Sequence, residues 1–158
     1  MLAWLESSQF SVWVRDELWG WPLALTIHAF GTAVVIGLTF IISLRLLGLF
    51  ETIPYTSLNR LFPVIWVALV VQFLSGFTLW MTKPTRYVAD GAFVLKLSLV
   101  VVGVVLTTYI YRMMKREAAA WEAAGANSPR EAKFVAATLL VWCGVLVAGR
   151  LTAHLGSL

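Results

Sequence analysis

The sequence predicts an all-α membrane protein: a four-transmembrane-helix up-down-up-down bundle with an N-terminal interfacial helix. Of the 158 residues, 60% are hydrophobic and only 13% are charged, whereas soluble domains carry about a quarter charged residues. Four apolar stretches each reach about 20 residues, the length that crosses a bilayer. The links between most of them are short, which favours antiparallel neighbours. We therefore expect one transmembrane domain, residues 1–158.

Residues 1–20 are predicted to form a short interfacial helix. The first charge is Glu6, and polar residues follow it at once, so the segment lacks the basic start and apolar core of a cleavable signal. Tryptophans suit the headgroup layer. Trp4, Trp13 and Trp19 lie in this segment, and Trp21 follows it directly. A loosely ordered aromatic tail is the alternative.

The spans are predicted at 22–44, 63–81, 91–111 and 134–155. Pro22 and Pro63 open the first two, where a missing N–H costs nothing. Asp90 is a plausible N-cap for the third. Ser128-Pro129-Arg130-Glu131 has capping-box spacing before the fourth. The segment 112–130 is alanine-rich and charged, so we expect it to continue the third helix into water and to turn at Gly125-Ala126-Asn127.

Basic residues predict the orientation. One side of the bundle carries Arg45, Arg60, Arg112, Lys115, Arg116, Arg130 and Lys133. The other side carries Arg15, Lys83 and Arg86, with Lys96 and Arg150 just inside the spans. The positive-inside rule makes the first side cytoplasmic, so both termini would be periplasmic if the membrane is a bacterial inner membrane. No basic run suits nucleic acid.

The only two histidines, His28 and His154, lie in the first and last spans. Because these spans run in opposite directions, both residues fall near the outer face, although His154 is shallower by about one turn. One imidazole from each of two helices is the ligand set of a b-type haem. The single cysteine, Cys143, excludes C-x-x-C attachment, so one non-covalent haem b is expected. Alternatively, each histidine bonds a neighbouring helix or faces solvent.

Three further residues are assigned to this site. Gly31 lets a porphyrin, or simply a neighbouring helix, come close. Arg150 shares a helix face with His154 and would pair with a haem propionate or the headgroup of a quinone-like ligand. Lys96 would serve the same anion or snorkel to the interface.

Other polar residues are few. Gln72 and Ser75, in the second span, either line the bundle interior or bond another helix. No span contains a carboxylate, so a proton pump is not expected.

Several sequence pieces together carry a resemblance. They are Trp19-Gly20-Trp21-Pro22, Ile27-His28-Ala29-Phe30-Gly31, Leu44-Arg45-Leu46-Leu47-Gly48-Leu49, Leu61-Phe62-Pro63, Trp66, Ser75-Gly76, Trp80, Lys83-Pro84, Tyr87, Phe93, Lys96, Leu140, Trp142 and Ala148-Gly149-Arg150-Leu151-Thr152-Ala153. With this set the chain resembles a bacterial family of short four-span membrane proteins of unknown function. The resemblance covers nearly the whole chain and implies fold and location only. That family often has an aromatic residue where this chain has His154.

Two functions are weighed. The first is a small b-type cytochrome, similar in architecture to known small cytochrome bundles, that passes electrons between quinol and a periplasmic redox partner. The alternative is a cofactor-free structural subunit or membrane anchor of a larger membrane complex. A permease is disfavoured because the spans have few polar residues and no broken helix. Whether the chain is an enzyme is left open.

Overall fold

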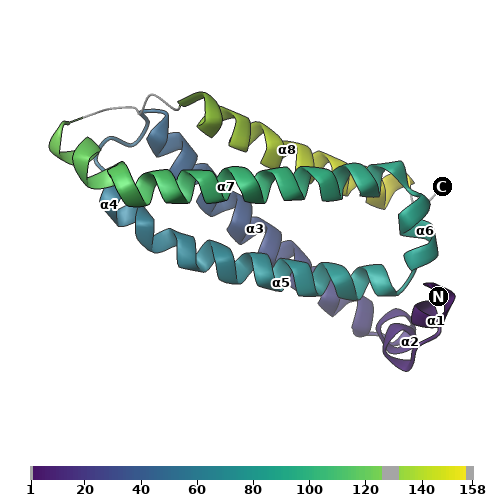
Figure 1. Cartoon of the computed structure of the whole chain (residues 1–158). Helices are drawn as coiled ribbons and strands as arrows, with labels where there is room; N and C mark the ends of the chain where they lie inside the picture. Colours follow the sequence, from purple (N-terminus) through teal and green to yellow (C-terminus); the bar gives the residue numbers. More distant parts are fainter. Residues whose placement is uncertain (1, 126–131, 156–158) are drawn as a thin grey trace.

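The structure, a computed structural model, describes residues 2–125 and 132–155, and side chains within 4–125 and 134–152 (Figure 1). Every regular element in these ranges is a helix. Four helices are long and apolar enough to cross a membrane, each alone or with the short turns before it. They are α3 (Gly20–Leu46), α5 (Phe62–Met81), α7 (Gly91–Ala123) and α8 (Ala132–Leu155). The predicted all-α class with four apolar helices is confirmed.

Successive long helices run in opposite directions along the bundle, and the N-terminus and the end of α8 lie at the same end (Figure 1). Their closest partnerships are α3 with α5 and α7 with α8. Short helices occupy two of the links: α4 (Tyr55–Leu58) continues through the 3-10 turn η1 (Asn59–Leu61) into α5, and α6 (Pro84–Ala89) precedes α7. These short helices were not predicted.

The helix starts follow local chemistry. Pro63 occupies the first turn of α5, and Asp90 caps α7 by accepting a hydrogen bond from the N–H of Ala92 at 2.9 Å, both as predicted. α3 begins at Gly20, so Pro22 lies third in its first turn. The predicted capping box at 128–131 lies outside the described residues.

The third span continues well beyond residue 111, as expected. α7 has 33 residues and ends at Ala123. Gly125 then turns with φ of +61°, a backbone conformation that glycine adopts without a steric penalty. The remainder of the predicted turn, residues 126 and 127, falls outside the part of the chain that the structure describes.

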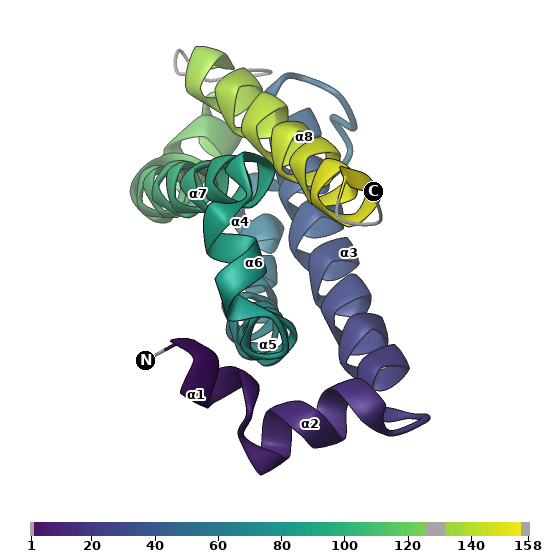
Figure 2. The same ribbon diagram turned by 90° about the vertical axis from the view of Figure 1, so that its right-hand side faces the viewer.

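The N-terminal segment forms two short helices where one was predicted. α1 (Leu2–Glu6) and α2 (Gln9–Asp16) are separated because Ser8 leaves helical geometry and its side chain accepts a hydrogen bond from the Ser11 N–H. α2 is joined to the bundle, since the Ser11 hydroxyl donates to the Met81 carbonyl at 2.9 Å and Val14 is buried. Figure 2 shows both helices beside the ends of α3 and α5. A position at the membrane surface stays a prediction.

Two clusters of buried side chains make the core. The larger one joins all four long helices and contains Ile42, Leu46, Tyr55, Leu58, Phe62, Ile65, Ile110, Met113, Met114, Ala118 and Val135. The smaller one contains Val35, Ile36, Ala68, Trp142 and Val145. Trp142 packs against Gly103 and its indole N–H donates to the Thr107 hydroxyl at 3.2 Å.

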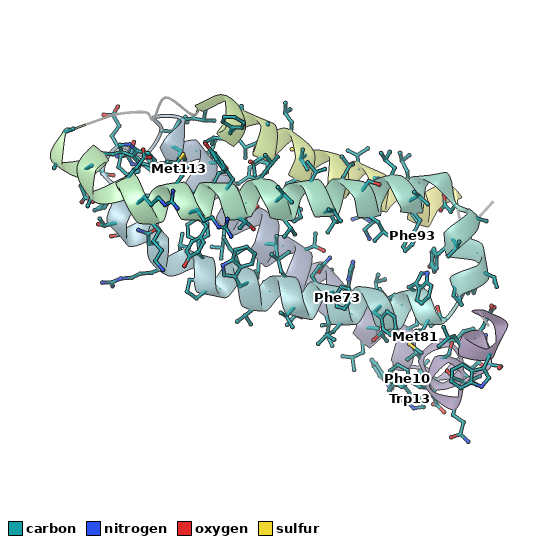
Figure 3. The ribbon with its side chains drawn as sticks, in the orientation of Figure 1. Phe10, Trp13, Phe73, Met81, Phe93 and Met113 are labelled. Atoms are coloured by element: carbon teal, nitrogen blue, oxygen red, sulfur yellow. The ribbon has the colours of Figure 1, made fainter. Side chains whose placement is uncertain are left out.

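The outer surfaces of the spans are strongly apolar, as the side chains in Figure 3 illustrate. Phe30, Phe73, Val101 and Leu140, which together represent all four long helices, each expose more than 60% of their surface. A water-soluble protein rarely leaves such continuous apolar surface exposed, so these faces indicate a lipid bilayer environment for a multi-pass protein.

Replacement of Gly20 by alanine should detach α2. A Cβ at Gly20 would lie 2.7 Å from the carbonyl oxygen of Val14 and 2.8 Å from that of Trp13, and backbone cannot move as cheaply as a side-chain tip. We expect faster tryptic cleavage after Arg15 in the Gly20→Ala protein. Gly37→Ala is the control, because a Cβ there meets nothing within 4 Å. Equal cleavage rates in the two variants would contradict the contact.

Candidate functional site

His28 faces helix α5, and both of its ring nitrogens are engaged there. Nδ1 lies 3.0 Å from the Ser75 hydroxyl, and Nε2 lies 2.9 Å from Nε2 of Gln72. The same Gln72 amide nitrogen donates to the Thr32 hydroxyl at 2.6 Å. These four residues, His28, Thr32, Gln72 and Ser75, are called the His28 cluster below. They join the first half of α3 to the second half of α5.

The hydrogen bonds of the cluster determine its proton positions. Ser75 uses its hydroxyl proton on the Val71 carbonyl, at 2.7 Å, so it accepts from the His28 Nδ1–H. Thr32 uses its hydroxyl proton on the His28 carbonyl, at 2.8 Å, so it accepts from Gln72. The second Gln72 amide proton then points at the bare Nε2 of His28. The histidine is therefore assigned, from its partners, as the neutral tautomer with its proton on Nδ1.

Two glycines allow this close approach of the helices. A Cβ on Gly31 would lie 2.7 Å from Oε1 of Gln72 and 3.6 Å from the Ala68 carbonyl oxygen. A Cβ on Gly76 would lie 3.0 Å from Cε1 of His28. Oε1 of Gln72 is buried against Gly31 and has no hydrogen-bond partner among the described atoms. Gly31 therefore serves helix packing, which was one of its two predicted roles.

Lys96 places a positive charge beside the cluster. It starts from α7, is half-buried, and lies along Gly149 of α8, whose Cβ position is 3.9 Å from the lysine Nζ. The Lys96 charge acts electrostatically on His28. Within the described side chains the one ion pair is Arg15 with Asp16 at the surface, so Lys96 has no carboxylate there. The polar side chains of this region therefore come from α3, α5 and α7, and Gly149 of α8 packs against Lys96.

The predicted site residues are only partly brought together. His28 and Gly31 lie at the α3–α5 contact, and Lys96 approaches them from α7. Arg150 is exposed on α8. His154 belongs to α8, but its side chain lies outside the described residues, so its pairing with His28 is not tested. Gln72 and Ser75 were anticipated as polar interior residues. Their bonds to His28, and the part played by Thr32, were not anticipated.

The arrangement around His28 bears on haem binding in two ways. The Nδ1–H bond to Ser75 suits a metal-ligating histidine, which usually donates its other ring nitrogen to an acceptor. However, Gln72 already occupies Nε2. One turn away, the backbones of α3 and α5 are so close that a Cβ on Gly31 would be in van der Waals contact with the Ala68 carbonyl oxygen. The α3–α5 contact is therefore direct helix packing, whereas the haem was predicted between His28 of α3 and His154 of α8 and is not tested.

Comparison with known proteins identified no relative of this chain. No family model, no curated protein and no solved structure matches this chain. The resemblance to the four-span family of unknown function therefore stays a prediction.

Replacement of Gly31 by alanine should loosen the α3–α5 pair. The new methyl would displace the Gln72 amide and with it the bonds to His28 and Thr32. Strain of this kind in packed interiors costs about 1–3 kcal/mol. We expect a lower thermal midpoint in detergent, followed by tryptophan fluorescence, whereas Gly37→Ala on the same helix should leave the midpoint unchanged or higher. A midpoint for Gly31→Ala equal to that of Gly37→Ala would refute the close contact.

Proposed function

We propose that this chain is a cofactor-free subunit of a larger membrane complex. The observation that carries the proposal is that His28 commits both ring nitrogens to the α3–α5 contact. A histidine used in this way holds two helices together and has no lone pair left for a metal. In lipid, such polar contacts between helices each contribute about 0.6–2 kcal/mol. The His28 cluster then holds α3 and α5 together in the half of the bundle that carries Lys96.

Lys96 supports the larger complex. Its ammonium lies inside a span, where an uncompensated charge is costly and normally pairs with another group. No carboxylate lies in α3, α5 or α8, and the acids of α7, Glu117 and Glu122, lie at its far end. The compensating anion must therefore come from outside the spans of this chain. An acidic residue on a partner's transmembrane helix is the source we propose.

The small internal contact area also supports a partner. Within the most apolar stretch of each spanning helix, only 17–28% of residues are buried inside the chain. The rest of each helix is available to lipid or to other membrane helices. A chain with so little internal burial has enough exposed helix surface to pack against the helices of other subunits.

A small b-type cytochrome is the second candidate function. The Nδ1–H bond of His28 to Ser75 favours it, because it leaves Nε2 without a proton. In this candidate His28 and His154 hold one non-covalent haem b, Arg150 and Lys96 face its propionates, and the protein exchanges electrons between quinol and a periplasmic partner. A dithionite-reduced spectrum distinguishes the candidates: a sharp α-band of six-coordinate haem would replace the first proposal with the second.

The oligomeric state tests the proposed subunit role. Native membranes solubilised in mild detergent should give, on blue native gels, a species much larger than the single chain. Lys96→Met should reduce that species because the partner's acid loses its counter-charge. Lys96→Arg should largely retain it, and so should Lys83→Met, which removes an exposed lysine from the same end of the bundle. A wild-type chain that migrates alone would exclude the proposal.

The proposed location is the bacterial inner membrane with both termini periplasmic, supported by the basic residues clustered at the opposite end. An alkaline phosphatase fused after Leu158 should be active, and one inserted after Gly125 should be inactive. The reverse pattern would place Lys96 and the His28 cluster in the cytoplasmic half of the membrane.

A further inference from the structure

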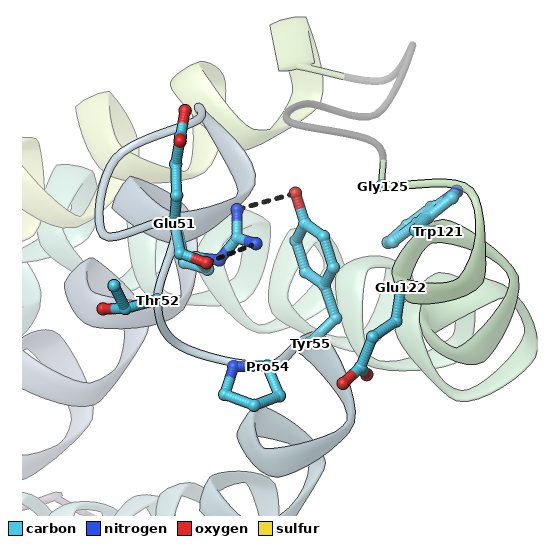
Figure 4. Close-up of a pocket in the computed structure, with 8 residues that line it drawn as sticks. Glu51, Thr52, Pro54, Tyr55, Trp121, Glu122 and Gly125 are labelled. Atoms are coloured by element: carbon cyan, nitrogen blue, oxygen red, sulfur yellow. Dashed lines mark hydrogen bonds between the residues drawn. The ribbon is translucent and has the colours of Figure 1, made fainter.

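A cavity of about 330 Å³ lies at the end of the bundle away from the termini (Figure 4). Four segments surround it: the end of α3, the loop that follows, α4, and the last turns of α7. The lining residues are Arg45, Glu51, Thr52, Pro54, Tyr55, Trp121, Glu122 and Gly125. The His28 cluster lies at the opposite end of α3, so this cavity is a separate feature.

Arg45 forms one wall of the cavity, with only 6% of its surface exposed. It was counted among the basic residues of the predicted cytoplasmic side, and its burial was not predicted. Nε donates to the Ile53 carbonyl at 2.7 Å, Nη1 donates to the Tyr55 hydroxyl at 2.9 Å, and Nη2 donates to the Glu51 carbonyl at 3.4 Å. The guanidinium carbon also lies 3.9 Å from the centre of the Tyr55 ring. The burial is possible because loop carbonyls replace water.

The charge of Arg45 is nevertheless not neutralised within the described side chains, where no carboxylate forms an ion pair with it. Three of its five N–H groups are used by the bonds above. The two that remain are on Nη1 and Nη2, the edge that recognises phosphate and carboxylate groups. The wall of the cavity therefore provides a positive charge with free donors.

The opposite side of the cavity is acidic and aromatic. Glu122 accepts a hydrogen bond from the Thr56 N–H through Oε2 at 3.2 Å, and neither Glu122 nor Glu51 has an ion pair in the described part of the chain. The Trp121 ring stands edge-on to Tyr55, with ring centres 5.6 Å apart. Figure 4 shows Trp121 and Glu122 on one side of the Tyr55 ring and Glu51 on the other. A carboxylate beside an indole is a setting that attracts an ammonium group.

We propose that this cavity binds a phosphoethanolamine group, with its phosphate on Arg45 and its ammonium between Glu122 and Trp121. A purely anionic ligand would face two glutamates, and a simple amine would face Arg45, so a zwitterion with separated charges matches the cavity best. Because Arg45 directly follows the predicted first span, 22–44, we expect the cavity to lie at the level of the lipid headgroups. A phosphatidylethanolamine headgroup and free phosphoethanolamine share this chemistry.

Lipid binding to the full-length protein tests the proposal. Native mass spectrometry would compare retention of phosphatidylethanolamine, phosphatidylcholine and phosphatidylglycerol with identical acyl chains. We expect phosphatidylethanolamine to be retained most, because the primary ammonium can donate hydrogen bonds to Glu122. Glu122→Gln should lower that retention about fivefold, because it removes one exposed ion pair and such a pair changes affinity by about this factor at most. The variant should fold, since the glutamine oxygen can still accept from Thr56. Glu117→Gln, an exposed change on the same helix, is the matched control.

Competition identifies the source of the ligand. If free phosphoethanolamine at millimolar concentration displaces the lipid, the ligand is soluble; if it does not, the ligand is the membrane lipid. Either result supports the cavity provided that Glu122→Gln lowers retention and Glu117→Gln does not. Equal retention of the three lipids by the wild-type protein, or retention that is unaffected by Glu122→Gln, would overturn the proposal.

Discussion

The hydrogen bonds of His28 set the geometry of half the molecule. In hydrocarbon an imidazole without partners is costly, and both nitrogens of this one are matched by side chains of α5. Matching them requires the two helices to approach closely, which in turn requires hydrogen in place of a methyl at Gly31 and Gly76. The polar bonds and the glycines therefore act as one constraint. Close packing without the hydrogen bonds would leave the imidazole ring unsatisfied, and without the glycines the helices could not come close enough to form those bonds.

The charged residues of the long helices differ in how they are accommodated. The helices α3, α5 and α8 contain no acids, and the environments of the three cations Arg45, Lys96 and Arg150 differ. Arg45 is buried and satisfied by carbonyl oxygens and a tyrosine. Lys96 is half-buried and has the neutral His28 cluster on one side and Gly149 on the other. Arg150 stays exposed. Backbone oxygens form hydrogen bonds with Arg45 without neutralising its charge. Arg45 and Lys96 therefore both keep a positive charge that an uncharged lipid tail cannot balance.

The fold was predictable because its signals are local. Apolar runs of spanning length, Pro63 in a first turn and Asp90 as an N-cap determine where helices lie without reference to the rest of the chain. The short helices α4 and α6 were missed, since four to six residues carry too little periodicity to register.

The candidate site was less predictable for a different reason. Sequence identified His28 and Lys96 as unusual and marked Gln72 and Ser75 as polar, yet which of them meet depends on how each helix is rotated about its axis. An almost uniformly apolar span gives little indication of that rotation. The burial of Arg45 was not predicted because two of its partners are main-chain carbonyls, and a pattern of side chains does not record where carbonyls point.

The length of α7 links the two ends of the molecule. Its 33 residues reach about 50 Å, against a hydrocarbon core of about 30 Å. Trp121 follows Lys96 by about seven full turns, so the two side chains leave the same face of one continuous rod. The sequence has no proline between the two positions. A rotation of α7 about its axis would therefore move Lys96 and Trp121 in the same sense.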